Sequence, residues 1–294
     1  MVIEIKTTHI RKALKVLQII LIQNKKGLLG LSILLFFAAI AIVADYIAPY
    51  DPYEIVAPPF QPPSSKHPLG TNDIGQDILS EVIYGTRISF YVGLTAPTLA
   101  AIIGLILGLA AGYLGGIVDE LISGVIDIML AIPSLPLIIV LAAYLGPSLN
   151  NIIVVLAIFG WVSIARVVRA QTLSVKERPY IEAARAIGAG DLRIMLKHIL
   201  PNIAPLVVAY IILGATTAIL TEAGLSFLGL GDPTAKSWGQ ILHHAHVRHA
   251  FELGLWQWVF VPGMCIALMG MSFTLLGMSI EEYVNPRLRS LRAE

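Results

Sequence analysis

The sequence is poor in cysteine and in charge, and both shortages limit what the protein can be. Its 294 residues include one cysteine, Cys265, which excludes an internal disulfide and a cysteine-rich metal module. Charged residues make up 13%, about half the share in soluble domains, whereas 56% of the residues are hydrophobic. A soluble protein of this size could not bury so much apolar surface, so an ordinary cytosolic enzyme is excluded. The net charge of +1 gives no reason to expect a nucleic-acid partner.

The motifs of several enzyme classes are also missing. The chain has no GxxxxGK[ST] phosphate loop, no HExxH zinc motif and no GxSxG nucleophile motif. Proton- and ion-coupled carriers usually have ionisable side chains inside their membrane spans, and here Asp127 is the one candidate. If the protein moves a solute uphill, we therefore expect its energy to come from a partner.

The sequence does contain six long apolar runs, each of about the length that a helix needs to cross a bilayer. Asp45 and Asp127 are the two charged residues within them, and the fourth run is short unless it extends toward Arg166. Because the runs are continuous rather than alternating, they predict helices and not barrel strands. The expected fold is an all-α integral membrane protein with six transmembrane helices. The runs are 28–48, 88–112, 121–145, 150–165, 203–221 and 258–280.

The lysines and arginines predict how the spans are oriented. Most of them lie in residues 1–27, 166–202 and 281–294, which six spans place on one side of the membrane. By the positive-inside rule that side is cytoplasmic, as are both termini. The expected organisation is a cytoplasmic N-terminus (1–27) with an interfacial helix at 10–22, a transmembrane domain (28–280), and a cytoplasmic tail (281–294). An external loop, Pro-rich at its start, is expected over 49–87.

The cytoplasmic segment 177–202 is too polar to cross a membrane but is patterned for two short helices. The first is predicted from Pro179 to Ile187, and Gly188 and Gly190 end it. The second is predicted to begin with Asp191 as its N-cap, because apolar residues recur after it at helical spacing. Small side chains on the first helix would allow close approach of another protein's groove. The pattern fits an amphipathic loop on the membrane surface equally well.

Resemblance to a known family favours the first interpretation. Glu182-Ala183-Ala184, Gly188 and Ile199-Leu200-Pro201 resemble the EAA loop of ABC importer permeases. Further segments resemble the second permease of dipeptide, oligopeptide and nickel importers, and together the matches cover roughly residues 24–290. These segments are Asn24 to Pro52, HPLGTNDIGQDILSEVIYGTRISFYVG at 67–93, Gly115 to Ser134, and EAGLSFLGLGDPTAKSWGQIL at 222–242.

The chain departs from the family's pattern at three positions. Members of the family often have arginine at the positions of Gln76 and Glu81. They often have another arginine at the position of Glu120, next to Asp119. No salt-bridge scheme is therefore carried over from relatives. The departures do not affect the resemblance to the EAA loop.

The resemblance implies a type I ABC permease fold and one of two permease subunits of an ATP-driven importer in the cell membrane. In that family the EAA loop is a coupling helix that docks on the ATP-binding subunit. The implied partners are a second permease, one or two ABC ATPase subunits, an extracytoplasmic solute-binding protein and the lipid bilayer. ATP and Mg²⁺ would bind to partner subunits, so we expect no cofactor and no catalytic residue in this chain. The coupling residues carried over are Tyr180, Glu182, Ala183, Ala184, Ile187, Gly188 and Asp191.

Four residues are candidates for the translocation path or its gate: Asp127, Glu222, Ser226 and Phe227. Asp127 would line the path, pair with the partner permease, or bond structurally to a neighbouring helix terminus; we favour the last, because carboxylates near the interface can be solvated. Residues 222–257 are expected to form an external re-entrant segment. That segment would act as a gate, as a seat for the solute-binding protein, or as a folded loop that seals the bundle.

A cluster of histidines in this segment raises the question of a metal site. Three of them could share one helical side, but no cysteine and, apart from Glu252, no carboxylate completes the set nearby. External loops also tolerate histidine freely, so no metal site is predicted. The histidines are His243, His244, His246 and His249.

The substrate expected from the resemblance is a di- or oligopeptide, because that is the family's commonest assignment. Oligosaccharides and nickel are the alternatives, since relatives transport them. A self-sufficient secondary transporter or channel is disfavoured by the lack of charge in the spans. The missing motifs disfavour a membrane protease, and a purely structural scaffold would leave the segment 177–202 unexplained.

Overall fold

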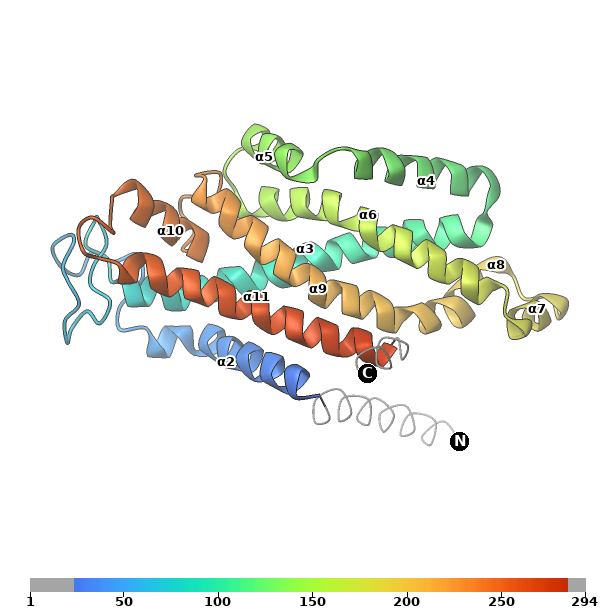
Figure 1. Cartoon of the computed structure of the whole chain (residues 1–294), viewed down its shortest axis with the longest axis horizontal. Coiled ribbons are helices and arrows are strands. Elements are labelled where there is room, and N and C mark those ends of the chain that lie inside the picture. Colours follow the sequence, from blue (N-terminus) through green and yellow to red (C-terminus); the bar gives the residue numbers. More distant parts are fainter. Residues whose placement is uncertain (1–23, 285–294) are drawn as a thin grey trace, which may run out of the picture.

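The computed structural model describes residues 24–284, and this part of the chain is helical apart from turns and one long loop (Figure 1). The predicted interfacial helix at 10–22 and the tail beyond residue 284 lie outside the described residues. The helices are α2 (Lys25–Ile47), α3 (Ile78–Leu114), α4 (Gly116–Ala131), α5 (Ser134–Leu145), α6 (Leu149–Lys176), α7 (Pro179–Ala186), α8 (Asp191–Ile194), the π-helical turn η1 (Met195–Ile199), α9 (Leu200–Phe227), α10 (Trp238–Val247) and α11 (Gln257–Val284).

The predicted all-helical membrane fold is confirmed, with one span broken. Five described segments are long and apolar enough to cross a bilayer, and the bent pair α4 and α5 makes up to six. Several helices are longer than the apolar runs that predicted them, because their ends continue beyond the apolar stretch. The five segments are Lys25–Ile47, Ile78–Leu114, Leu149–Lys176, Asp191–Phe227 and Gln257–Glu282.

The third predicted span, 121–145, is two helices that meet at 91°. Helix α4 ends at Ala131, and Ile132 is extended (φ −93°, ψ 133°). Pro133 explains the break, because a proline lacks the N–H that would continue the helix and disfavours helical geometry in the residue before it. Pro136 lies in the first turn of α5, where a missing N–H leaves no helical bond unmade, so it adds no further bend.

Helices α3 and α6 pack with almost no side chain between them. A Cβ atom added to Gly108 would lie 2.5 Å from the carbonyl oxygen of Ala165, and one added to Gly112 would lie 2.8 Å from that of Arg169. Gly104 faces α6 in the same way. Small residues at this spacing allow the close backbone approach typical of membrane helices. We therefore treat α3 and α6 as one tightly packed pair.

The bundle has two distinct ends (Figure 1). Helix α7 projects at one end, and α10 lies at the other together with the loop of residues 48–77. We call these the α7 end and the α10 end. The start of α2 and the end of α11 meet, because the Asn24 side chain donates a hydrogen bond to the Glu282 carboxylate at 3.0 Å.

Helix α9 is longer at its C-terminal end than the sequence indicated. Residues 222–227 are its last turns, so the expected external re-entrant segment 222–257 is wrong in its first six residues. Gly224 has open space around it and stays helical, since a glycine in a helix costs only about 1 kcal/mol. The helix stops just before Gly229, which takes a left-handed conformation with φ +83°. The remainder of the segment contains α10.

Candidate functional site

Helix α7 is held to the bundle by two buried side chains. Pro179 occupies its first turn, as predicted. Ile181 is fully buried and Ala184 is 7% exposed, and Ile181 packs in one apolar cluster with Ile194 and Tyr113. Ala184 therefore faces the bundle rather than a partner. The other residues predicted for ATPase coupling are exposed, namely Tyr180, Glu182, Ala183, Ile187, Gly188 and Asp191.

The C-terminus of α7 closes in a Schellman motif around Gly188. The Gly188 N–H donates to the Arg185 carbonyl at 2.9 Å, and the Ala189 N–H donates to the Ala184 carbonyl at 3.0 Å. Gly188 has φ +83°, a left-handed conformation that disfavours any residue with a Cβ atom. Ile187, just before it, is 86% exposed. The turn thus presents an apolar side chain to solvent on a fixed backbone.

Asp191 does not act as the predicted N-cap of α8. Gly190 is the N-cap residue, and no side chain caps this helix. The Asp191 carboxylate instead accepts a hydrogen bond from the hydroxyl of Tyr113, at 2.7 Å. Asp191 is thereby bonded to the end of α3, a role that its local sequence could not reveal.

Helix α8 runs into α9 through the π-helical turn η1. Segment Asp191–Phe227 is therefore one continuous helical element of 37 residues, about 55 Å long at 1.5 Å per residue. Pro201 lies in the first turn of α9 and does not interrupt it. A displacement of α7 would pass through the turn at Gly188–Gly190 into this helix, which continues past Pro201 and Pro205 to the far end of α9.

A cleft of about 380 Å³ lies between α3, α5, α6 and α9. A second hollow of about 300 Å³ adjoins it and shares Ile138, Thr217 and Thr221. The cleft is lined by apolar side chains and hydroxyl groups, without a charged side chain among its lining residues. The hydroxyl groups belong to Ser134, Ser163, Tyr210, Thr217 and Thr221.

The four residues predicted for the translocation path or its gate are not among the lining residues of this cleft. Asp127 is exposed on α4, and Phe227 lies at the end of α9. Glu222 and Ser226 are each 1% exposed, and the Ser226 hydroxyl donates to the Glu222 carboxylate at 2.7 Å. They pack against α10, where a Cβ atom on Gly239 would come within 2.8 Å of the Ser226 Cβ.

The histidines of α10, and His249 in the turn that follows it, contact separate neighbours. The imidazole of His243 bonds the Phe227 carbonyl at 2.8 Å, and His244 bonds Gln240 at 3.3 Å. His249 pairs with Glu252 at 3.5 Å. Burial lowers the pKa of His244, which favours its neutral form. Within residues 24–284 no three His, Cys, Asp or Glu side chains gather as a metal site would require.

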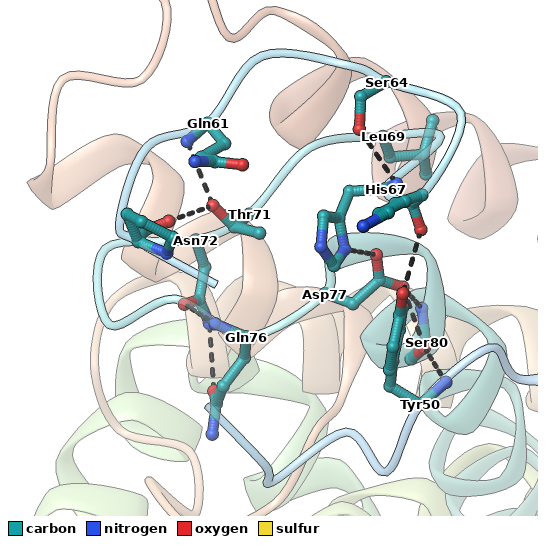
Figure 2. Close-up of polar contacts among 12 residues, drawn as sticks. Tyr50, Gln61, Ser64, His67, Leu69, Thr71, Asn72, Gln76, Asp77 and Ser80 are labelled. Atoms are coloured by element: carbon teal, nitrogen blue, oxygen red, sulfur yellow. Dashed lines mark hydrogen bonds and ion pairs between the residues drawn. The ribbon is translucent and has the colours of Figure 1, made fainter. Parts of the chain in front are cut away.

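The loop at the α10 end is held by buried polar groups (Figure 2). The Asp77 carboxylate accepts from the Ser80 hydroxyl at 2.8 Å and faces the His67 imidazole at 3.0 Å. The Asn72 side chain donates to Gln76 at 2.9 Å. Because each buried polar group finds a partner, this irregular loop keeps one conformation.

Comparison with known proteins agrees with this architecture. Residues 104–290 match the family described as "Binding-protein-dependent transport system inner membrane component". Residues 19–63 match the "N-terminal TM domain of oligopeptide transport permease C". A solved structure titled as inward-facing conformations of the MetNI methionine ABC transporter aligns with a TM-score of 0.51 and 20% identity, covering 68% of this chain and 96% of that one. The likeness to that structure supports the fold.

Sequence relatives cover nearly the whole chain. The dipeptide transport system permease protein DppC of Haemophilus influenzae is 41% identical over 276 residues, which are 91% of this chain and 92% of that protein. The oligopeptide transport system permease protein OppC of Bacillus subtilis is 36% identical, covering 91% and 87%. The chain is therefore a multi-pass membrane protein that belongs to the family of binding-protein-dependent transport system inner membrane components, and within it resembles the DppC and OppC permeases.

Proposed function

We propose that the chain is one of two permease subunits of an ATP-driven importer and that a partner ATPase drives it through α7. The main support for the proposal is the arrangement of exposed and buried residues at the α7 end. The helix exposes Glu182, Ala183 and Ile187, while Ile181 fixes it to the bundle. Its chain continues into the 37-residue helix that borders the cleft. An exposed surface joined through one short turn to the helix that borders the cleft suits a subunit that receives motion from a partner.

The charge distribution supports a cytoplasmic position for the α7 end. Arg178, Arg185, Arg193 and Lys197 lie in or beside α7 and α8. The positive-inside rule places such a concentration of basic residues in the cytoplasm, where ATP is available. The partner subunits would then hold ATP and Mg²⁺, and the α10 end would meet an extracytoplasmic solute-binding protein. The chain itself supplies the path and carries out no chemical step.

The cleft is the proposed half of the translocation path, and di- or oligopeptides are its proposed substrate. Its apolar and hydroxyl lining offers weak contacts to varied solutes, as a path for peptides of differing sequence requires. A dehydrated nickel ion would instead need imidazole, thiolate or carboxylate ligands. Relatives named for dipeptide and oligopeptide transport support the same choice.

The test is ATP-driven uptake in vesicles that contain the chain with its partner permease, ATPase subunits and solute-binding protein. We expect uptake of the labelled dipeptide to require ATP. Uptake should be lost in Ile187→Asp, because docking of the ATPase would remove water from the new carboxylate at a cost in free energy. Val247→Asp is the matched control for ATPase binding, which it should leave unchanged, since Val247 is also exposed, at 51%, but lies at the α10 end, away from α7. Dipeptide uptake by the chain without an ATPase, or full activity of Ile187→Asp, would contradict the proposal.

A further inference from the structure

Tyr113 lies where four elements meet at the α7 end. It belongs to the last turn of α3, and its side chain contacts Lys176 at the end of α6, Arg185 on α7 and Asp191 on α8. Tyr113 is 4% exposed, whereas Arg185 and Asp191 are exposed, so these contacts lie at the edge of the buried core. No local pattern in the sequence marks this residue.

The Tyr113 hydroxyl forms a hydrogen bond that joins two of these elements. It donates to the Asp191 carboxylate at 2.7 Å, across 78 positions of sequence. A hydrogen bond to a carboxylate is charge-assisted, and partial burial strengthens it. Asp191 is the first residue of α8 and leaves that helix without a side-chain cap to make this bond.

Two cations lie over the same aromatic ring. The Lys176 ammonium is 5.4 Å from the ring centre, and the Arg185 guanidinium carbon is 5.5 Å away. Lys176 also donates to the backbone carbonyl of Tyr113, one of the carbonyls that the end of α3 leaves without a helical partner. The ring is thus attached to α6 through Lys176 and to α7 through Arg185.

These contacts join two rigid parts of the bundle. One part is the tightly packed pair α3 and α6, where Gly108 and Gly112 leave no space between the backbones. The other part is α7 with the continuous helix Asp191–Phe227. The cleft lies between them, lined by residues of α3 and α6 on one side and of α9 on the other. Relative movement of these two parts would change the width of the cleft, and Tyr113 lies between them at the α7 end.

We propose that Tyr113 is a positioning residue that transmits the movement of α7 and α8 to α3 and α6, so that ATP hydrolysis opens and closes the cleft. This inference rests on the proposed coupling through α7. Tyr113 is buried and does not line the cleft, so in this proposal it acts through Asp191 and Arg185. Loss of its hydroxyl leaves the docking surface of α7 in place but loosens the connection behind it.

The test is Tyr113→Phe in the assembled complex, with dipeptide uptake and ATP hydrolysis measured on the same vesicles. We expect the ATPase to remain bound and transport per ATP to fall about three- to tenfold. Tyr84→Phe is the matched control, because the Tyr84 hydroxyl also donates to a carboxylate on another helix, that of Asp45, at 2.7 Å. Tyr84 lies near the other end of the same helix, α3. Tyr84→Phe should therefore keep the native ratio of dipeptide transported to ATP hydrolysed.

Asp191→Ala removes the other partner of the bond and provides the second variant. It should lower the ratio as Tyr113→Phe does, and the double variant should be no worse than either single one, because both remove the same bond. Native transport per ATP in Tyr113→Phe, or additive losses in the double variant, would overturn the inference. Failure of the proposed function would look different: Ile187→Asp would then keep both ATPase binding and uptake.

Discussion

The Lys236 ammonium group donates to the Glu81 carboxylate at 2.6 Å, joining the α9–α10 connection to the first turn of α3. Both side chains are largely buried, with 16% and 4% of their surface exposed. Lys236 also donates to the Gln76 side-chain oxygen at 2.6 Å. Gln76 and Glu81 are two positions at which the resemblance leads us to expect arginine, and in the structure they share one cation.

Removing that cation should destabilise the α10 end. In Lys236→Met the Glu81 carboxylate stays buried without its ion pair, which costs about 3 kcal/mol. Arg248→Met is the control, because Arg248 pairs with Asp73 while its own side chain is 54% exposed, so we expect a loss of at most about 1 kcal/mol. Thermal unfolding of the purified proteins in detergent measures both. Equal transition temperatures for the two variants would show that the buried pair contributes no more than the exposed one.

The turn after α7 should depend on glycine at one position and not at its neighbour. Gly188→Ala forces a left-handed residue with a Cβ atom, at a cost of about 1–2 kcal/mol, and should weaken ATPase binding about fivefold or more. Gly190→Ala is matched to it, since Gly190 has φ −68° and both positions have open space. Titration of ATPase onto the purified permease pair gives the affinities. Gly188→Asn should recover part of the loss, because asparagine tolerates this conformation; equal affinity of both alanine variants would refute the role of the turn.

Close packing of α3 on α6 predicts a strict size limit. In Gly108→Ala the added methyl group would lie 2.5 Å from the Ala165 carbonyl oxygen, so the helices must separate, at a cost of about 1–3 kcal/mol. Gly124→Ala on α4 meets nothing within 4 Å and should be neutral or slightly stabilising. The yield of monodisperse protein and its thermal midpoint report the difference. A Gly108→Ala protein as stable as the native one would mean that α3 and α6 are not a rigid pair.

A bulky side chain in the cleft should block the path without releasing the ATPase. Thr217 is exposed on α9 and lines both hollows, so Thr217→Trp should reduce dipeptide uptake at least tenfold while ATPase binding persists. Val208 lies on the same helix, is 48% exposed and lines neither hollow. Val208→Trp should therefore transport normally. Native uptake by Thr217→Trp would place the path elsewhere.

Local sequence was enough to predict the spans and α7. Long apolar runs, Pro179 at a helix start and Gly188 at its end act through the backbone nearby, and the structure contains the helices that they indicate. Pro133 and Pro136 in the run 121–145 predict a kink, but not its angle of 91°, which depends on the extended backbone of Ile132.

Long-range contacts were out of reach of the sequence pattern. Asp191 has the residue type of an N-cap, yet its carboxylate bonds Tyr113, 78 positions away. Gly224 resembled part of a loop, but helix α9 accommodates it. The cleft collects residues from four helices, and no local signal marks Ser163 or Thr217 as neighbours of one space.

The most direct test of coupling through α7 is site-specific cross-linking in the assembled transporter. Replacing Cys265, the chain's single cysteine, with alanine gives a background for Ile187→Cys on the exposed turn of α7 and for Val247→Cys at the opposite end. We expect a short cross-linker with one thiol-reactive and one photoreactive group to join residue 187, and not residue 247, to the ATPase subunit, with a yield that changes when ATP is added. A complex that hydrolyses ATP and imports peptide while residue 187 forms no cross-link to the ATPase would contradict coupling through α7.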